Sequence, residues 1–492
     1  MSALFLGIDV GTSSTKGVLV RPDGEIVASA SRAHEFDLPR PGWAEHDADQ
    51  IWWGDFVAIA RSLTAPLAEP VTAVGVSGIG PVLQPTDERD RPLRPAILYG
   101  IDTRAGQEID ELNAELGADA IAERAGAPLT SQAIGPKLRW LRRHEPEVWR
   151  RTRRIHMANS YLVRRLTGEY VLDHHSASQA IPLYDSRKLD WADGWAAAIA
   201  EHIELPRLAW PAETAGLVTA TAAAETGIPA GTPVTTGTID AWTEALSVGV
   251  RRPGDVMLMY GTTMFIIAAL DARRVSPPLW GTVGTFPGTF SLAAGMATSG
   301  ATADWVRRLA GQPDFAGLAA EAGQSPPGAN GLLMLPYLAG ERSPLFDPDA
   351  RGILAGLTLR HGRGDVYRAA LEATAYGVRH NLESFAEAGA EPRRLVAVGG
   401  GTTGGLWTRI VSDVLQRPQS LCATPIGACL GAAYLAALTA GADVDIDAWN
   451  PVVTLVEPDP AHAAVYDEGY ALYRRLYHDT VDIAHALAAR QV

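Results

Sequence analysis

The fold is decided by residues 4–16, whose sequence is Leu-Phe-Leu-Gly-Ile-Asp-Val-Gly-Thr-Ser-Ser-Thr-Lys. A short apolar run ends at the carboxylate of Asp9, and a glycine, four hydroxyl residues and Lys16 follow. A carboxylate at the end of a strand can hold a hydrated Mg²⁺. The backbone N–H groups and hydroxyls after it can bind phosphate oxygens, because glycine lets the main chain approach closely. The stretch therefore predicts a phosphate-binding turn, with an ordinary tight turn as the alternative.

The residues after this turn predict a hairpin. Residues 17–20 and 25–28 flank a Pro-Asp-Gly turn, and the chain has no Walker A motif. The same device recurs after mid-chain, where residues 255–260 and 264–267 flank Gly-Thr-Thr at 261–263. Two hairpins of this kind predict a pair of similar domains that face one nucleotide.

The length and charge of the chain limit its class. A chain of 492 residues is too long for one core, and 47% apolar with 20% charged residues is typical of an α/β protein. There are 42 Lys and Arg against 56 Asp and Glu, for a net charge of −14. This balance argues against a nucleic-acid partner, but Mg²⁺ and backbone dipoles can still serve a phosphate ligand.

The sequence also predicts the compartment. Cys422 and Cys429 do not make a disulfide framework, which favours a reducing cytoplasm. Asp9 interrupts the apolar run at the amino terminus, which we therefore interpret as a strand and not a signal peptide. No stretch approaches about 20 uninterrupted apolar residues, so no membrane span or membrane partner is expected.

Two acidic positions are candidates for chemistry. The strand at 232–238 leads to Asp240, where a helix begins; a carboxylate there can be a general base or an N-cap. Asp102 and Arg104 follow the segment 93–99 and can grip a polyhydroxylated ligand, with a surface ion pair as the alternative. Trp43, in the loop 41–47, forms either a wall of a substrate cleft or a buried anchor of its loop.

Two glycine-rich segments indicate nucleotide contacts. Gly300 lies in a small-residue turn before the helix predicted at 302–310, a position that suits a phosphate. Residues 399–401 are three glycines between the strand 395–398 and a helix from Leu406. They leave room for a flat ring such as adenine, and a flexible turn is the alternative.

Taken together, these motifs resemble those of the FGGY-type carbohydrate kinases of the actin-like ATPase superfamily, and most of all the xylulose kinases. The similarity spans nearly the whole chain and several motifs in the right order. They are Asp9-Val10-Gly11-Thr12-Ser13-Ser14, Pro41-Gly42-Trp43-Ala44-Glu45-His46, Asp102-Thr103-Arg104, Asp240, Gly261-Thr262-Thr263, residues 335–344 and Gly399-Gly400-Gly401.

The resemblance implies an α/β fold with two ribonuclease-H-like domains, at 1–244 and 245–492, and a deep interdomain cleft. A sugar or polyol would lie deep in the cleft and MgATP nearer its mouth. Asp240 matches the family's catalytic base, and Asp9 matches the residue that holds Mg²⁺ through water. The positions implied for ATP and its phosphates are Gly11, Thr12, Ser13, Ser14, Lys16, Gly261, Thr262, Thr263, Gly300, Gly400, Gly401 and Thr402. Those implied for the substrate are Gly80, Pro81, Asp102, Arg104 and Asp240.

One loop departs from the family pattern. Xylulose kinases resemble one another in a Ser-Gly-Gln-Met-His-Gly loop, where this chain has Ser-Gly-Ile-Gly-Pro-Val at 77–82. Loss of a buried hydrogen-bonding partner costs about 1–3 kcal/mol, enough to change substrate preference. Tyr-Gly-Ile at 99–101 also replaces the usual Trp-Asn or Trp-Gln.

The expected function is ATP-dependent phosphorylation of a hydroxyl on a ketopentose such as xylulose. The alternatives are a kinase for another polyol, sugar acid or signalling carbohydrate, an actin-like ATPase without sugar kinase activity, and a kinase-like protein that has lost turnover. A homodimer is common among relatives and is the oligomer to expect.

Overall fold

The computed structural model describes residues 3–66, 69–311 and 314–491. The chain forms two compact units. Unit 1 consists of Met1–Arg251, Leu270–Ser291 and Ile426–Pro451, and unit 2 of Arg252–Ala269, Leu292–Pro425 and Val452–Val492. The chain therefore passes between units more often than one break after residue 244 predicts. The predicted boundary between the family's two domains stays a prediction.

The main sheet of unit 1 carries the first hairpin. The strands of this unit are β1 (Phe5–Val10), β2 (Ser14–Val20), β3 (Ile26–Ala33), β4 (Glu45–His46), β5 (Ala73–Gly78), β6 (Gln84–Thr86), β7 (Ala96–Ile97), β8 (Arg154–His156), β9 (Val171–Asp173), β10 (Tyr184–Asp185), β11 (Asp190–Trp191), β12 (Arg207–Ala209), β13 (Thr214–Leu217), β14 (Pro233–Thr235), β15 (Thr238–Ile239) and β18 (Trp280–Val283). The main sheet has the order β13-β14-β5-β1-β2-β3, with β15 beside β5. Strands β1, β2 and β3 are antiparallel neighbours, which confirms the predicted hairpins, whereas β5 runs parallel to β1.

Several helices of unit 1 pack on strands of this sheet. The helices of the unit are the π-helix η1 (Ala48–Trp53), α1 (Gly54–Thr64), α2 (Gly106–Leu116), α3 (Ala118–Ala125), α4 (Ile134–His144), α5 (Pro146–Arg151), α6 (Ala158–Thr167), α7 (His174–Ser178), α8 (Trp195–Ala200), α9 (Ala220–Thr226), α10 (Asp240–Ser247), α15 (Ala428–Thr439) and α16 (Ile446–Trp449). Those that pack on the sheet include α1, α6, α10 and α15. The helical segment after the loop 41–47 begins as the π-helix η1 and continues as α1.

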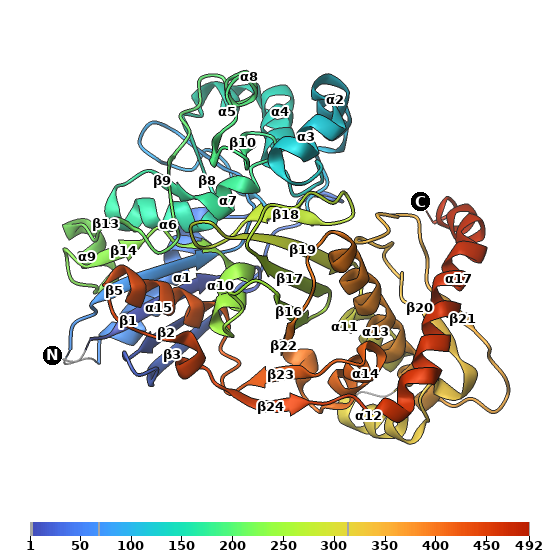
Figure 1. Ribbon diagram of the computed structural model, residues 1–492. Coiled ribbons are helices and arrows are strands. Elements are labelled where there is room, and N and C mark those ends of the chain that lie inside the picture. Colours follow the sequence, from blue (N-terminus) through green and yellow to red (C-terminus); the bar gives the residue numbers. More distant parts are fainter. Residues whose placement is uncertain (1–2, 67–68, 312–313, 492) are drawn as a thin grey trace. The chain divides into compact units, whose positions relative to one another are not determined.

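Helix α15 lies directly on the strands β1, β2 and β5 (Figure 1). Gly7 and Gly75 allow this approach: a Cβ at Gly75 would stand 1.8 Å from the carbonyl oxygen of Ala432, and one at Gly7 2.1 Å from that of Cys429. Helix α10 packs on the same helix. Since Asp9 is the second-last residue of β1 and α10 begins at Asp240, this packing fixes the two acidic positions within one unit.

Unit 2 repeats the arrangement. Its strands are β16 (Asp255–Tyr260), β17 (Met264–Leu270), β19 (Phe290–Met296), β20 (Leu333–Leu335), β21 (Ile353–Ala355), β22 (Arg394–Val398), β23 (Gln419–Cys422) and β24 (Val452–Val456), and β17 and β19 each have one end in unit 1. The main sheet follows the order β19-β17-β16-β22-β23-β24. Strands β16 and β17 form the predicted antiparallel hairpin, and β22 runs parallel to β16. The recurring hairpin with a parallel neighbour confirms the predicted α/β class with two similar folds.

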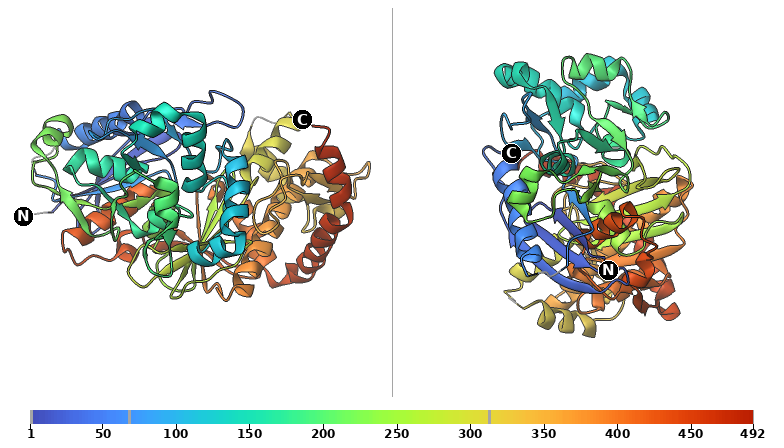
Figure 2. Two further views of the ribbon diagram at one scale, coloured as in Figure 1. Left: turned by 90° about the horizontal axis from the view of Figure 1, so that it is seen from above. Right: turned by 90° about the vertical axis from the view of Figure 1, so that its left-hand side faces the viewer.

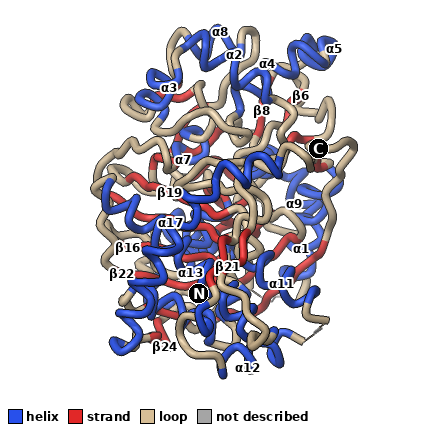
Figure 3. Tube along the Cα trace, turned by 90° about the vertical axis from the view of Figure 1, so that its right-hand side faces the viewer, coloured by secondary structure: helices blue, strands red, loops and turns tan. Residues whose placement is uncertain are grey.

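Unit 2 also contains eight helical segments in its described residues. They are α11 (Gly300–Leu309), α12 (Phe315–Gln324), η2 (Ala329–Gly331), α13 (Arg363–Glu387), η3 (Gly400–Thr402), α14 (Leu406–Leu415), η4 (Pro460–His462) and α17 (Ala463–Ala488). The long α17, red in Figure 2, packs on α13, α14 and β20, and Figure 3 shows it in front of α13. None of the helices in the described part of the chain combines the length and the apolar composition needed to span a bilayer.

Candidate functional site

A chain of hydroxyl groups links Asp9 to the start of α10. Asp9 and Ser77 are register partners at the ends of the parallel strands β1 and β5. The Ser77 hydroxyl donates to Asp9 Oδ1 at 2.8 Å and lies 2.7 Å from Thr243 Oγ1, which in turn donates to the Asp240 carbonyl at 2.9 Å. Four buried or half-buried residues from three elements are thus joined in one network.

Asp240 lies in the first turn of α10. Its N-cap is Ile239, so the N-cap interpretation of Asp240 is wrong. The carboxylate accepts a 2.7 Å hydrogen bond from the N–H of Ala241 and is half-buried. Burial raises its pKa well above the usual value, and the negative charge of Asp9 raises it further. A carboxylate held in this way is more basic than one in water, which suits a group that takes up a proton.

Two further carboxylates share this environment. Burial raises the pKa of Asp9 to about 6, while the Ser77 hydrogen bond and the charge of Lys16 act in the opposite direction. Burial, followed by the charge of Asp9, raises the pKa of Glu244 to about 7. Three carboxylates near one lysine leave an excess of negative charge, a setting that fits a divalent cation.

The sequence analysis missed Glu244. It lies four residues after Asp240, and positions i and i+4 share one face of a helix. Its carboxylate also accepts from the N–H of Ala428 at the start of α15. The i,i+4 spacing from Asp240 was the available signal, but nothing local showed that α15 begins beside it.

The predicted turn after β1 is present, and its role toward phosphate stays a prediction. The N–H of Gly11 donates to the Ser14 carbonyl at 3.0 Å, which closes the turn. Thr12, Ser13 and Ser14 are half-buried or exposed. Lys16 is exposed on β2 and pairs in register with Asp9. The hydroxyl of Thr12 lies 3.1 Å from that of Tyr99, a second residue whose role the sequence did not indicate.

Asp102 and Arg104 form a buried ion pair and not the surface pair considered as the alternative. Arg104 Nη2 lies 2.6 Å from Asp102 Oδ2, and neither side chain is exposed. Asp102 also accepts from the N–H of Ala44 at 2.8 Å. The two groups therefore hold one another and the loop 41–47, and their predicted role toward a substrate stays a prediction.

Aromatic rings and a lysine surround this ion pair. The Arg104 guanidinium lies 4.0 Å from the ring centre of Trp43 and 5.0 Å from that of Trp140, and Glu45 lies 2.8 Å from Arg104 Nη1. The contacts of Trp43 support its interpretation as an anchor of the loop. Burial lowers the pKa of Lys137 to about 7, and this lysine donates to the carbonyl of Leu98 at 2.7 Å.

The loop 79–82, whose sequence differs from the family pattern, packs beside Asp240. A Cβ at Gly80 would stand 2.6 Å from Cγ1 of Ile239, the residue before Asp240. Ile79, Pro81 and Val82 are buried. The predicted substrate residues Gly80 and Pro81 thus lie on an apolar segment that touches the residue preceding the candidate base.

In unit 2 the structure brings Gly300 to the second turn. Gly261 N donates to the Thr263 carbonyl at 3.1 Å, and the Gly300 and Ala301 N–H groups donate to the carbonyls of Gly261 and Thr262, each at 3.0 Å. Helix α11 therefore begins at this turn. The arrangement places the amino-terminal end of a ten-residue helix beside a glycine-threonine bend, and the predicted role of both toward phosphate stays a prediction.

The predicted nucleoside loop lies against the same hairpin. A Cβ at Gly401 would stand 2.7 Å from the ring of Trp407 and 2.9 Å from Cβ of Tyr260, the residue before Gly261. Gly400 is exposed, and Gly401 and Thr402 are half-buried in η3. All predicted nucleotide residues of unit 2 therefore belong to one contiguous group.

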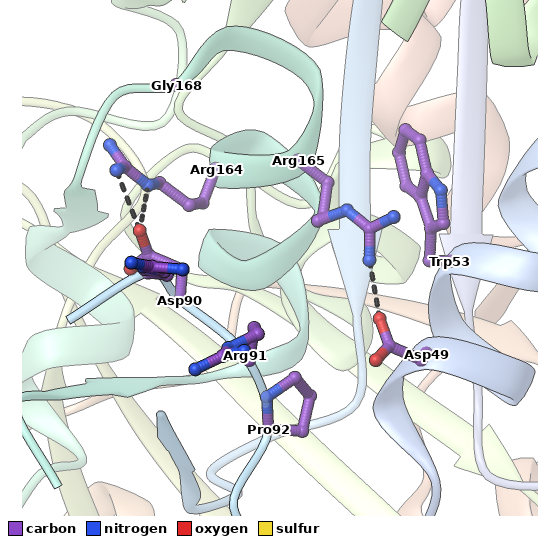
Figure 4. Close-up of a pocket in the computed structure, with 9 residues that line it drawn as sticks. Asp49, Trp53, Asp90, Arg91, Pro92, Arg164, Arg165 and Gly168 are labelled. Atoms are coloured by element: carbon purple, nitrogen blue, oxygen red, sulfur yellow. Dashed lines mark hydrogen bonds and ion pairs between the residues drawn. The ribbon is translucent and has the colours of Figure 1, made fainter. Parts of the chain in front are cut away.

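A separate cavity of about 690 Å³ lies on η1, the loop 89–92 and the end of α6 (Figure 4). Four arginines line it, but Arg164 pairs with Asp90 and Arg165 with Asp49. No predicted site residue lines this cavity. Its cations are largely neutralised by the chain itself, so we assign it no ligand.

Comparison with known proteins gives matches over the whole chain. The model of the FGGY family of carbohydrate kinases, N-terminal domain, matches residues 4–247, and the C-terminal domain model matches residues 256–440. The chain is 30% identical to the xylulose kinase of Escherichia coli (strain K12), covering 96% of this chain and 98% of that protein. It is 27% identical to the gluconokinase of Bacillus subtilis (strain 168), covering 99% and 96%. The crystal structure of xylulose kinase from Rhodospirillum rubrum has a TM-score of 0.92 and 36% identity, covering 98% and 100%.

Proposed function

Because the chain belongs to the FGGY family of carbohydrate kinases, and so transfers the γ-phosphoryl group of ATP to a hydroxyl of a sugar or polyol, we propose that its acceptor is a ketopentose such as xylulose. The similarity to xylulose kinases over nearly the full length supports this substrate. The similarity to a gluconokinase over the same length makes a sugar acid the alternative.

One observation carries the mechanism: the hydroxyl network from Asp9 through Ser77 and Thr243 ends on the backbone carbonyl of Asp240 and so ties the first turn of α10 to the end of β1. In this proposal Asp240 accepts the proton of the attacking hydroxyl. Its raised pKa supports that role, since a base is most effective when its pKa lies near the working pH.

Mg²⁺ fits the excess of carboxylates described above. Asp9 would hold the hydrated ion, which neutralises charge on the phosphate oxygens when bound. In the described residues no group of three or more histidine, cysteine or acidic side chains could hold a metal by itself. Mg²⁺ favours sites where it keeps several water molecules and binds one or two carboxylates together with phosphate oxygens.

Nucleotide binding is assigned to the two glycine-hydroxyl turns and the glycine loop. Phosphoryl transfer depends mainly on alignment and charge neutralisation, which backbone N–H groups, hydroxyls and a lysine provide. The proposed phosphate residues are Gly11, Thr12, Ser13, Ser14, Lys16, Gly261, Thr262, Thr263 and Gly300. The proposed nucleoside residues are Gly400, Gly401 and Thr402.

The acceptor is assigned to Gly80, Pro81, Asp102 and Arg104, together with Asp240. The apolar loop around Gly80 leaves few polar side chains to recognise a sugar from that side. Asp102 contacts a sugar in this proposal only after its hydrogen bonds to Arg104 rearrange, because both of its oxygens are engaged.

Release of ADP with a panel of ketoses, polyols and sugar acids tests the proposal. We expect release that depends on a ketopentose and is lost in Asp240→Asn, whereas Asp190→Asn, an exposed acid on β11, retains activity. Turnover with gluconate and not with ketopentoses would show that the acceptor is a sugar acid. Hydrolysis of ATP at one rate with every sugar would instead make the chain an ATPase.

Two further expectations belong to this proposal. The enzyme acts in the cytoplasm, which the free thiols of Cys422 and Cys429 support. It forms a homodimer, which light scattering after gel filtration tests directly.

A further inference from the structure

The hydroxyl of Tyr99 joins two loops that are 87 residues apart. It lies 3.1 Å from the hydroxyl of Thr12, in the turn to which phosphate binding is assigned. Tyr99 itself belongs to the segment between β7 and α2 that carries Asp102 and Arg104. The contact therefore connects the proposed acceptor segment to the proposed phosphate turn within unit 1.

The backbone on the Tyr99 side of this contact is held at three points. Lys137 Nζ donates to the Leu98 carbonyl at 2.7 Å, and Ser131 Oγ donates to the Gly100 carbonyl at 3.0 Å. The N–H of Asp102 donates to the carbonyl of Tyr99 at 2.9 Å. The main chain that carries Tyr99 is thus held by contacts that do not involve Thr12.

The backbone on the Thr12 side is held as well. Gly11 N donates to the Ser14 carbonyl at 3.0 Å, and the N–H of His34 donates to the Ser13 carbonyl at the same distance. The ring of His34 lies 3.1 Å from the Gly11 carbonyl oxygen. The two hydroxyls thus lie on main-chain segments that are held independently of each other. In their contact one hydroxyl donates its proton and the other accepts, so the contact decides where each proton points.

The hydrogen-bonding capacity of a hydroxyl limits the possible directions. Each hydroxyl donates one hydrogen bond and accepts up to two. If Thr12 donated to Tyr99, it would present only lone pairs to a phosphate, which is itself an acceptor. If Tyr99 donates to Thr12, the Thr12 proton is directed to a phosphate oxygen. Only the second arrangement supports an anion, and charge-assisted hydrogen bonds of this type are the stronger ones.

We propose that Tyr99 is a positioning residue that directs the hydroxyl proton of Thr12 toward the transferred phosphoryl group. This inference rests on the proposed function, since it assigns Thr12 to phosphate. It adds to that function a residue of the acceptor segment, Tyr99, that orients a hydroxyl of the phosphate turn.

A double-mutant cycle of Tyr99→Phe and Thr12→Val tests the inference. Phenylalanine keeps the ring and removes the hydroxyl, and valine keeps the branched shape of threonine. We expect Tyr99→Phe to lower kcat roughly tenfold with little change in the KM for the sugar. In the Thr12→Val background the same change has no further effect, because no hydroxyl proton remains to be directed.

Equal losses from Tyr99→Phe in both backgrounds would assign the tyrosine a structural role and overturn the inference. An unchanged kcat in Tyr99→Phe would also overturn it. Tyr161→Phe is the matched control: it removes another tyrosine hydroxyl of unit 1, one that donates to Asp49, and should leave kcat and both KM values unchanged.

Calorimetry with a non-hydrolysable ATP analogue separates this inference from the proposed function. If no sugar is phosphorylated, the kinase assignment fails, but analogue affinity still reports on the turn. Weaker binding in Tyr99→Phe, absent in the Thr12→Val background, supports the positioning role. Identical affinities for wild type and Tyr99→Phe contradict it.

Discussion

Ser77 donates a 2.8 Å hydrogen bond to the carboxylate of Asp9, although 68 residues separate them in the chain. Parallel pairing of β5 with β1 places the two side by side at the ends of their strands. Burial raises the pKa of Asp9 to about 6, and this hydrogen bond is the largest influence in the opposite direction. Ser77 therefore favours the charged form of the carboxylate to which Mg²⁺ is assigned.

Replacement of Ser77 by alanine removes that hydrogen bond, so the pKa of Asp9 rises. A metal ligand must be deprotonated, and protons compete with Mg²⁺ for it. We expect the acid limit of Mg²⁺ binding, and of the activity that depends on it, to move upward by about one pH unit in the variant. Activity measured against pH at several Mg²⁺ concentrations checks this shift.

The matched control is Ser178→Ala, which removes a buried serine hydroxyl that donates to the His175 carbonyl in the same unit. It should lower stability without moving the acid limit. A Ser77→Ala enzyme with the pH profile of the wild type would contradict the assigned role of the hydrogen bond.

Glu244 acts on a different carboxylate, Asp240, and raises its pKa. Its negative charge contributes to the raised pKa of Asp240, and neutralisation in Glu244→Gln lowers that pKa. The base is then deprotonated at lower pH, so we expect the ratio of activity at acid pH to activity at pH 8 to rise severalfold. Rate measurements from pH 5 to 9 at saturating substrates test this ratio.

Glu225→Gln, a half-buried glutamate in helix α9, is the control for loss of one carboxylate. Its pH profile should match that of the wild type. If the Glu244→Gln profile moves toward higher pH, the charge coupling between Glu244 and Asp240 has the wrong sign and the interpretation fails.

The two hairpins were predictable because each is encoded by neighbouring residues. In each hairpin an apolar strand is followed by a glycine and hydroxyl residues and then by a second strand. This local pattern was enough to place Asp9 at the end of the first strand and Gly261 in the second turn. The helix that begins at Asp240 was predictable for the same reason. Local pattern was sufficient wherever the partners lie within a few residues of one another.

Relationships across the chain were not predictable. Nothing in the sequence around Ser77 shows that β5 pairs with β1, and the sequence distinguishes Ser77 only as the first residue of the loop 77–82. Helix α15 is apolar on most of its surface, so its sequence does not show which sheet it covers. Its position on unit 1 is set by the close contact at Gly7 and Gly75, which depends on atoms more than 350 residues apart.

The buried pair of Asp102 and Arg104 predicts a large effect on stability. In Arg104→Met, Asp102 loses its partner in a site with no exposed side-chain surface. Removal of one member of a buried pair costs about 3–5 kcal/mol, because the other charge remains buried. Urea unfolding of the variant should show a loss of this size in the free energy of unfolding.

The double variant Asp102→Asn with Arg104→Met separates charge from packing. It leaves no uncompensated aspartate, so its free energy of unfolding should exceed that of Arg104→Met alone. A double variant that is less stable than the single one would show that the contacts of Arg104 with Trp43 and Glu45 dominate.

The contact between Gly80 and Ile239 predicts a steric effect that a second substitution relieves. A methyl group at Gly80 would stand 2.6 Å from Cγ1 of Ile239 and 2.7 Å from its Cδ1, closer than real Cβ contacts. Gly80→Ala should therefore lower the free energy of unfolding by about 1–3 kcal/mol and lower kcat, because Asp240 directly follows the displaced residue.

In the double variant with Ile239→Ala both clashing atoms are absent, so most of the lost stability and activity should return. Ile239→Val keeps a methyl at the γ position and should restore less. Thermal unfolding and initial rates of the four proteins measure this, and failure of Ile239→Ala to restore either quantity would show that the glycine is needed for another reason.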